Sequence, residues 1–406
     1  MVILQKTRCT LLIFLLLLFP LLSAVTQITA CEQPLNASGE WYYLSGNLSI
    51  SGATCLNVIA ANITLDCAGF SITGNNSTGT FGIYTNQFNT TIRGCNIGNF
   101  ATGIFFETAD NGTISNSNAS TSQNASGNNG YGIYLYNGSN YNQITGSRAN
   151  STANNPAKGT GVYLNLNSIY NVINNSIAAS TFGNGLFINS GSNWNTISRC
   201  ELSSSSTSAA YAVYISNSHN NTLEQCNATS GTTTAFYVVQ STYNNITNCK
   251  VRVLTATTGH GIRLLTSSHY NRIIGTEVFS GANGIYINSN GGNNVFIDCQ
   301  GVSISGKNSS SGIKLEGGAD IIAQNCNISN FSSAINLSGA TGALFLNNTF
   351  TPDNARTQPH VFISNLSSNN TFCLNNFTVT SGVYVNDTNG GNFYNCTYES
   401  KNQGNI

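Results

Sequence analysis

The sequence is poor in charge: only 7% of its residues are Asp, Glu, Lys or Arg, and 14 acidic residues balance 14 basic ones. Ordinary globular domains carry roughly 25% charged residues. A nucleic-acid-binding protein needs a basic stripe that neutralises phosphates, and this chain has none. We therefore expect no nucleic-acid partner. Ser, Thr, Asn and Gly fill the polar positions instead.

Long hydrophobic runs are also missing after the N-terminus. The only one, residues 11–22, follows Lys6 and Arg8 and is short for a membrane span, so residues 1–30 are predicted to be a secretory signal peptide. Cleavage after Ala24 or Ala30 would suit the small residues there. Alternatively, residues 28–31 form a lipoprotein-like box that would leave a lipid anchor at Cys31. We expect a secreted or cell-surface protein with no transmembrane segment after the signal peptide.

What the chain has in abundance is an internal repeat, in which two aliphatic residues flank one outward residue. The repeat occurs thirteen times between Ile83 and Val383, with a mean period of 25 residues. The first inward position holds Ile83, Ile104, Ile133, Val162, Leu186, Val213, Phe236, Ile262, Ile285, Ile313, Ile335, Val361 and Val383. The second holds Thr85, Phe106, Leu135, Leu164, Ile188, Ile215, Val238, Leu264, Ile287, Leu315, Leu337, Ile363 and Val385. Period-two alternation predicts a strand with this pair facing inward.

A second, shorter strand pattern follows in each repeat, as in Ile197, Cys200 and Leu202. An Asn precedes it by two residues in many repeats: Asn142, Asn171, Asn195, Asn221, Asn244, Asn271, Asn294 and Asn370. Asn tolerates the left-handed backbone of a tight corner, and stacked amides can hydrogen-bond, so we interpret this row as an asparagine ladder. Such short strands bury an apolar face only when coils stack about 4.8 Å apart. The pattern therefore predicts a parallel β-solenoid of about 13 coils.

These repeats, together with the opening segment NITLDCAGFSITG at residues 62–74, resemble the PbH1-type β-helix repeats of the pectate-lyase-like superfamily, especially NosD-type exported proteins. The resemblance implies an all-β, single-stranded right-handed parallel β-helix. We expect a signal peptide at 1–30, an N-terminal cap and first coil at 31–80, the β-helix at 81–400 and a C-terminal tail at 401–406. The chain shows no evident C-terminal cap, so a partner is expected to cover the open end or the chain to continue. The superfamily includes lyases, hydrolases, binding proteins and passive rods, so the resemblance implies fold rather than activity.

The 12 cysteines of an exported chain suggest disulfides. Seven of them, however, occupy the inward small position of the second strand, where other repeats have Ser or Thr: Cys95, Cys200, Cys226, Cys249, Cys299, Cys326 and Cys396. Side chains stacked in register are separated by the inter-strand distance, which exceeds the mean disulfide Cβ–Cβ distance of about 3.8 Å. We therefore predict an interior stack of free thiols and one disulfide, Cys31–Cys55. A soft-metal site on Cys200, Cys226 and Cys249 is the alternative.

No metal or cofactor is expected. His219 and His269 share a repeat position but lie two coils apart, about 10 Å, whereas direct coordination needs about 2 Å from each nitrogen. With only 4 His and 1 Met, the resemblance to NosD-type proteins carries no copper site here. The Asp clusters of calcium-dependent pectate lyases are absent as well.

The chain offers no confident catalytic residue. Glu277 and Asp298 are expected to face outward in neighbouring coils, about 8 Å apart, as inverting glycosidases require. The alternative is a solvated ladder with Lys250 over Glu277. A Gly-His-Gly element around His260 is similar to a polygalacturonase motif, but no aspartate pair accompanies it.

The outward residue between the two aliphatics is the most informative surface feature, because it is aromatic in ten of thirteen repeats. Candidate binding residues are Tyr84, Phe105, Tyr134, Tyr163, Phe187, Tyr214, Tyr237 and Tyr286. Further aromatics recur near the following turn: Tyr141, Tyr170, Trp194, Tyr243 and Tyr270. An exposed aromatic row can stack on sugar rings or bury against a partner. Alternatively, the aromatics only stabilise the sheet from outside.

We therefore expect a non-catalytic secreted or cell-surface rod that binds a glycan or a cell-envelope protein along this aromatic stripe. One alternative is a polysaccharide lyase or glycoside hydrolase with a groove near Glu277 and Asp298. Another is a passive structural protein of the envelope.

Overall fold

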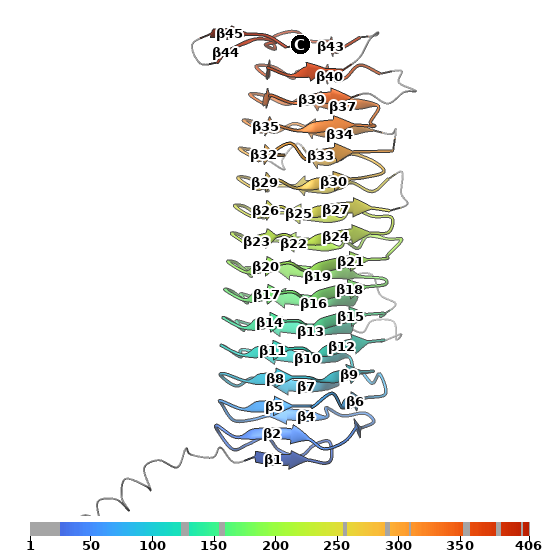
Figure 1. The fold of residues 1–406 in the computed structure, drawn as a ribbon, viewed down its shortest axis with the longest axis vertical. Helices are drawn as coiled ribbons and strands as arrows, with labels where there is room; N and C mark the ends of the chain where they lie inside the picture. The colour runs from blue at the N-terminus through green and yellow to red at the C-terminus, as the bar shows by residue number, and fades with distance from the viewer. Residues whose placement is uncertain are drawn as a thin grey trace, which may run out of the picture.

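The computed structural model describes residues 25–122, 130–153, 159–254, 258–288, 293–307, 310–351, 358–378, 383–398 and 401–405. The chain winds into a rod of stacked coils (Figure 1). Each full coil contributes one strand to each of three parallel sheets, and successive coils add neighbouring strands. The described residues contain no helix. The predicted all-β parallel β-helix is therefore confirmed.

Sheet A has 15 strands: β1 (Val25–Ile28), β2 (Trp41–Leu44), β5 (Thr64–Asp66), β8 (Thr91–Arg93), β11 (Thr113–Ser115), β14 (Gln143–Thr145), β17 (Val172–Asn174), β20 (Thr196–Ser198), β23 (Thr222–Glu224), β26 (Asn245–Thr247), β29 (Arg272–Ile274), β32 (Phe296–Asp298), β35 (Ile322–Gln324), β38 (Leu344–Leu346) and β41 (Thr371–Cys373).

Sheet B has 14 strands: β4 (Leu56–Val58), β7 (Phe81–Thr85), β10 (Thr102–Glu107), β13 (Gly130–Tyr136), β16 (Gly159–Asn165), β19 (Asn184–Asn189), β22 (Val213–Ser216), β25 (Phe236–Val239), β28 (Ile262–Leu265), β31 (Ile285–Ile287), β34 (Ser311–Glu316), β37 (Ser333–Ser338), β40 (Val361–Ser364) and β43 (Val385–Asp387).

Sheet C also has 14 strands: β3 (Leu48–Ser49), β6 (Ser71–Thr73), β9 (Asn96–Gly98), β12 (Asn118–Thr121), β15 (Arg148–Ser151), β18 (Ile177–Ser180), β21 (Glu201–Ser204), β24 (Asn227–Ser230), β27 (Lys250–Val253), β30 (Glu277–Phe279), β33 (Ser303–Ser305), β36 (Asn327–Ser329), β39 (Thr349–Thr351) and β42 (Asn376–Phe377). Strands β44 (Cys396–Tyr398) and β45 (Lys401–Gln403) form a separate antiparallel pair.

The aliphatic pairs of sheet B form one wall of the core, and inward residues of sheets A and C form the rest. From Ile83 to Ile363, every predicted inward residue of the first twelve repeats is buried, because alternation along each strand sends both members to the same face. The prediction for the thirteenth repeat is wrong by two residues. Val361 pairs with Val385 rather than with Val383, which is 59% exposed.

The asparagine ladder lies inside the corner between sheets B and A. Within it, the Asn195 backbone N–H donates to Asn221 Oδ1 (2.9 Å), and the Asn195 amide donates to the Ser168 carbonyl (3.0 Å) and to Asn221 Oδ1 (3.1 Å). The ladder is confirmed for Asn142, Asn171, Asn195, Asn221, Asn244, Asn271 and Asn370, all at most 2% exposed. The prediction is wrong for Asn294, because Val295 occupies the buried position of that coil.

Four disulfides correct the prediction that only Cys31 and Cys55 are bridged. Besides Cys31–Cys55, the structure links Cys67 to Cys95, Cys299 to Cys326 and Cys373 to Cys396. The Cα atoms of the second and third pairs are 4.8 Å apart, which lies within the usual disulfide range of about 4.4–6.8 Å. Stacked side chains need not stay parallel, since χ1 rotation brings the sulfurs together. Cys200, Cys226 and Cys249 remain free and buried.

The N-terminal region also departs from expectation. Residues 1–24 of the predicted signal peptide lie outside the described residues, but β1 begins at Val25 and pairs with β2. Of the two cleavage alternatives, the one after Ala24 keeps this strand and the one after Ala30 removes it. Because the sulfur of Cys31 is in a disulfide, it is not free to carry a lipid, so the structure contradicts the lipid anchor.

The C-terminal end is partly covered, whereas an open end with a plain tail was expected. Residues 401–406 were predicted to be a tail, but β45 pairs with β44 above the last coil (Figure 1). Asn405 accepts a hydrogen bond from the Asn375 N–H (3.0 Å), and its own amide donates to the Phe372 carbonyl (3.1 Å). A row of amides formed by Asn348, Asn375 and Asn405 thus runs out to the cap.

We predict that replacing Asn195 by Ala lowers the free energy of unfolding by about 1–3 kcal/mol, because the buried N–H of Asn171 loses its acceptor. Chemical denaturation followed by circular dichroism measures the loss. Asn118→Ala is the control, since that side chain is exposed and should cost under about 0.5 kcal/mol. Equal losses for the two variants would contradict a stabilising ladder.

We predict that peptide mapping without reduction recovers the four disulfides, and that Cys200, Cys226 and Cys249 react with a maleimide only after denaturation. The reason is burial, since none of these three side chains is more than 1% exposed. Finding Cys226 bridged to either neighbour in the native protein would show that the thiol stack is not maintained.

Candidate functional site

The aromatic stripe predicted on sheet B faces outward, but its rings stack on one another. Ring centroids lie 4.9 Å apart for Tyr134–Tyr163, 4.7 Å for Tyr163–Phe187 and 4.5 Å for Phe187–Tyr214, with planes within 5° of parallel. The eight predicted binding residues are all buried or half-buried: Tyr84, Phe105, Tyr134, Tyr163, Phe187, Tyr214, Tyr237 and Tyr286. The expectation of an exposed, shallow aromatic face is therefore wrong.

A second set of rings packs against the rings of the stripe. Tyr131 packs against Tyr163 with centroids 5.2 Å apart, and Tyr211 packs against Tyr237 at 4.4 Å. Aromatic pairs of this kind contribute about 0.5–1.5 kcal/mol each beyond their buried area. The stripe thus packs as an outer layer on sheet B, in agreement with the alternative interpretation.

The stripe ends in a charged cluster. The guanidinium of Arg263 lies over the rings of Tyr237 (5.6 Å) and Tyr286 (5.3 Å). The Tyr286 hydroxyl donates to Glu316, whose carboxylate also pairs with Lys314. Burial, and then the hydrogen bond to Glu316, raise the pKa of Tyr286, so this phenol stays protonated at neutral pH. Lys314 and Glu316 thus pair with each other, whereas Arg263 contacts the two rings and its buried Nε has no hydrogen-bond partner among the described residues.

His260 belongs to the same cluster. Its Nδ1 accepts a hydrogen bond from the Asn283 backbone N–H (3.3 Å), and its ring packs on Tyr286 at 4.9 Å. Burial, followed by the charges of Arg263 and Lys314, lowers the pKa of His260 to about 4. The imidazole is therefore neutral at neutral pH and makes a poor general acid.

Glu277 and Asp298 do not form a convergent pair. Glu277 opens β30 of sheet C and lies 3.8 Å from Arg252 of the preceding coil. Asp298 ends β32 of sheet A and accepts hydrogen bonds from Gln324 (2.8 Å) and Asn325 (3.0 Å) of the following coil.

The pKa of Asp298 also argues against a role as a catalytic acid. Burial raises its pKa, but hydrogen bonds from Asn325, Gln324 and the Gln300 N–H outweigh that effect and hold the pKa below its usual range. Asp298 is therefore a fixed carboxylate rather than a proton donor. Lys250 does align with Glu277, as the solvated-ladder alternative required. Glu277 lies on sheet C, Asp298 lies on sheet A, and His260 precedes β28 of sheet B, so each candidate contacts a different set of partners.

Five exposed aromatic residues lie at the corner between sheets B and A, directly before the ladder asparagines. This corner row consists of Tyr141, Tyr170, Trp194, Tyr243 and Tyr270, which are 42–53% exposed. Hydrogen bonds between coils keep the row in register, for example from the Trp194 N–H to the His219 carbonyl (3.2 Å). Neighbouring rings run nearly parallel, 5.1 Å apart for Tyr141–Tyr170 and 4.8 Å for Tyr243–Tyr270.

Every residue of the corner row has a left-handed backbone. Their φ angles lie between 57° and 61°, a conformation that costs a residue with a Cβ about 1–2 kcal/mol. Other coils place Asn at the same corner, as at Asn111, Asn220 and Asn294. Asn adopts this conformation at lower cost, because its short side chain hydrogen-bonds locally. Aromatic residues at this corner are therefore not what the backbone alone favours.

The corner row is interrupted once, where Asn220 stands between Trp194 and Tyr243. Two coil steps separate these two rings, about 9.6 Å along the rod. Trp194 is nearly parallel to Tyr170, and Tyr243 to Tyr270, at interplanar angles of 14° and 4°. We call the resulting gap between the Trp194 and Tyr243 rings the slot; the half-buried Asn220 lies between them in the row.

Polar groups flank the slot. His219 lies beside Asn220, and its Nδ1 accepts a hydrogen bond from the Thr242 backbone N–H (3.1 Å), which leaves Nε2 as the protonated nitrogen. Burial lowers the pKa of His219, so the ring is neutral at neutral pH and Nε2–H acts as a donor. Asn193 and Thr242 continue this polar row in the adjacent coils.

The sequence contains the signal for this site, although it led us to expect the binding residues on sheet B. The recurrence of the corner aromatics is visible in the repeats. Period-two alternation cannot show that the aromatic rings on sheet B stack on one another and cover their own faces. It also cannot show that the corner rings stay exposed.

Among the described residues, no group of three His, Cys, Asp or Glu side chains is arranged to hold a metal ion. That part of the chain also contains no helix long and apolar enough to cross a membrane.

Comparison with solved structures finds distant resemblances. The A-module of mannuronan C-5 epimerase from Azotobacter vinelandii is 14% identical, with 87% of this chain and 86% of that chain covered and a TM-score of 0.42. The periplasmic alginate epimerase is 12% identical over 82% of this chain and 76% of that chain, with a TM-score of 0.47. Tailspike protein 3 of bacteriophage CBA120 is 9% identical over 88% and 56%, with a TM-score of 0.46. These values are too low to transfer a function.

No curated protein sequence matches the chain. The family model described as a right-handed β-helix region matches residues 81–251 and 149–300, which together span more than half of the chain. The narrower resemblance to NosD-type proteins stays a prediction. The chain belongs to the right-handed β-helix family.

Proposed function

We propose that the protein is an exported carbohydrate-binding rod whose contact surface is the corner row rather than the stripe on sheet B. The observation that carries the proposal is the set of five exposed aromatic rings held in left-handed backbone conformation. Strained backbone at an exposed position is a reason to look for function there. Ring stacking within the row offsets only part of the strain.

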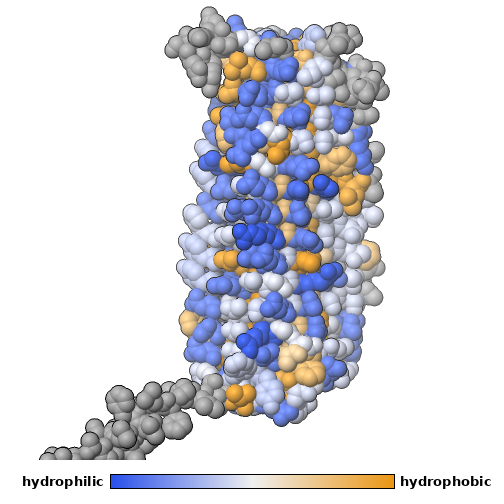
Figure 2. All heavy atoms as spheres, in the orientation of Figure 1, coloured by the Kyte–Doolittle hydropathy of each residue, from blue (hydrophilic) through white to orange (hydrophobic). Residues whose placement is uncertain are grey.

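Carbohydrate suits the chemistry of this surface. Sugar rings present C–H faces to aromatic rings and hydroxyls to amides, and the corner row lies beside a polar row that includes Asn140, Asn193 and Thr242. On the face shown in Figure 2, hydrophobic residues are scattered among hydrophilic ones. A large hydrophobic protein interface would need a contiguous apolar patch instead. The polar row beside the corner aromatics favours a glycan over the alternative of a cell-envelope protein.

The slot between Trp194 and Tyr243 is where a sugar ring would bind most closely. A flat ring in van der Waals contact on both sides needs about 7–8 Å between the flanking planes. The slot is wider, about 9.6 Å, so a puckered saturated ring fills it better than a flat one. Asn220 and the Nε2–H of His219 can then hydrogen-bond to the hydroxyls.

Export is part of the proposal. The four disulfides form and persist in oxidising compartments, in agreement with a secreted or cell-surface location. The N-terminal segment predicted to be a signal peptide is consistent with this location.

We predict that Trp194→Asn combined with Tyr243→Asn reduces glycan binding about tenfold or more, equivalent to about 1.4 kcal/mol. Asn is the residue that other coils use at this corner, so the melting temperature should hold or rise. A glycan array followed by calorimetry on the best ligand measures the loss.

The matched control is Tyr163→Ala with Tyr214→Ala in the stripe. It should lower the melting temperature and leave binding unchanged, because those rings pack on the Phe187 ring between them. Unchanged binding in the corner variant, or loss only in the stripe variant, would contradict the proposed surface.

We predict no turnover of polygalacturonate or alginate, because Glu277, Asp298 and His260 lie in different parts of the coil and each is already held by its own partners. Lyase products absorb in the ultraviolet, which provides a direct assay. Activity that disappears in Glu277→Gln or Asp298→Asn would overturn this prediction.

A further inference from the structure

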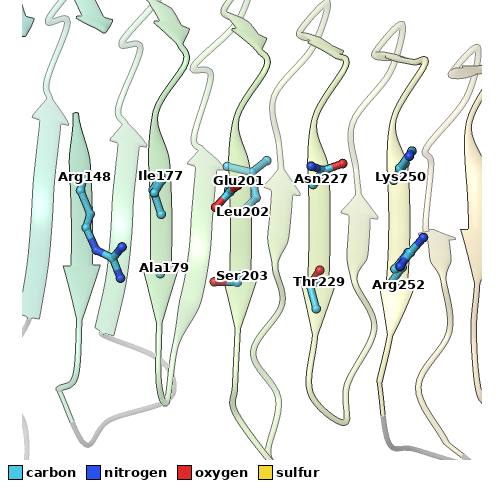
Figure 3. A pocket seen from close by; sticks show the side chains of 10 residues that line it. All are labelled: Arg148, Ile177, Ala179, Glu201, Leu202, Ser203, Asn227, Thr229, Lys250 and Arg252. Atoms are coloured by element: carbon cyan, nitrogen blue, oxygen red, sulfur yellow. The ribbon is translucent and has the colours of Figure 1, made fainter. Parts of the chain in front are cut away.

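A second surface, on sheet C, has the shape and charge of a ligand groove. It has a volume of about 520 Å³, within the range of about 300–1,000 Å³ for ligand sites. It crosses five consecutive strands, from β15 to β27 (Figure 3). The corner row lies between sheets B and A, so this groove faces another side of the rod.

Two rows of side chains line the groove. The strand register aligns the first row as Arg148, Ile177, Glu201, Asn227 and Lys250. It aligns the second row as Ala179, Ser203, Thr229 and Arg252. Figure 3 shows long side chains at the two ends and short ones along the second row between them. Four coil steps, about 19 Å, separate the two ends.

The two ends of the groove are cationic. Arg148 stands at one end, Lys250 and Arg252 stand at the other, and the only acidic residue in the lining is Glu201. All four are exposed. The contact of Arg252 with Glu277 is long, at 3.8 Å, and solvated, so it leaves the guanidinium available. In a chain with 7% charged residues, this is a local concentration of positive charge.

We propose that the groove binds a linear acidic oligosaccharide lengthwise along the rod. Carboxylates of the ligand pair with Arg148 at one end and with Lys250 and Arg252 at the other. Neutral sugar units cross the low floor formed by Ala179, Ser203 and Thr229. The groove does not depend on the corner row, and it adds a ligand class, acidic glycan, that the corner row does not specify.

The distribution of charge favours this ligand over nucleic acid. A nucleic acid carries a phosphate at every nucleotide and needs basic groups all along its path. Here the centre of the groove holds the carboxylate of Glu201 and no cation. A chain whose carboxylates are separated by neutral sugars brings fewer negative charges near Glu201 than a uniformly charged polymer does, so the repulsion is weaker.

The test uses hyaluronan oligosaccharides, in which uronate alternates with a neutral sugar, and compares them with dextran and single-stranded DNA by calorimetry. We expect hyaluronan to bind, and to bind more weakly as salt rises and the Debye length falls from about 30 Å at 0.01 M to about 8 Å at 0.15 M. The triple variant Arg148→Ala, Lys250→Ala and Arg252→Ala should lose about tenfold in affinity. Glu201→Gln should bind about two- to fivefold more tightly.

Two control variants test whether hyaluronan binding depends on this groove alone. Arg272→Ala removes a cation on sheet A, where it lies over Phe296, and should leave hyaluronan binding unchanged. Trp194→Asn with Tyr243→Asn should also leave it unchanged, so failure of the corner proposal and failure of this one are distinguishable. Retained affinity in the triple variant, weaker binding in Glu201→Gln, or equal binding of dextran or DNA would overturn the proposal.

Discussion

Parallel hydrogen bonding between successive coils is the constraint on which the rest of the structure depends. It places each residue over its equivalent in the next coil, as in the pairing of Ile133 with Val162 and of Leu186 with Val213. Any residue type that recurs at one position therefore becomes a continuous row. A lone buried Asn would leave donors and acceptors unsatisfied, at about 1–3 kcal/mol each. In the ladder, Asn195 is satisfied by Asn221 because the next coil supplies the partner.

The same constraint explains why the rings of the sheet B stripe pack on one another. The spacing of the coils nearly equals the preferred stacking distance of aromatic rings, about 4.5–7 Å between centroids. An unbroken row of rings on a sheet therefore covers its own faces, as Tyr163 and Phe187 do. At two of the three breaks in the stripe a cation fills the gap: Arg263 lies over the Tyr237 ring and Lys314 over the Tyr286 ring. The third break holds Asn336. The break in the corner row at Asn220 has a short side chain instead, so two ring faces stay open.

The sequence was sufficient for the repeat, the inward residues and most of the ladder, because these follow from periodicity alone. It failed where periodicity is ambiguous. Val383 and Val385 are both aliphatic and two residues apart, so alternation could not choose between two registers. The bridge between Cys299 and Cys326 depends on side-chain rotation, which spacing does not determine. The terminal pairing of β45 with β44 breaks the repeat and left no periodic signal.

Candidate sites were harder to predict because each coil turns through three sheets. Glu277 and Asp298 are close in the repeat alignment, but a corner separates β30 from β32, so their carboxylates bond to different coils. The repeat alignment predicts reliably which residues are neighbours along one row. Which residues of different rows are neighbours depends on the corners, which the alignment does not describe. The groove on sheet C follows this rule, since the change from Ala179 to Arg252 along one row forms its floor and one of its ends. In a solenoid of this kind, a surface differs from the rest of the rod where residue size or charge changes along a row. The corner slot and the sheet C groove both lie at such changes.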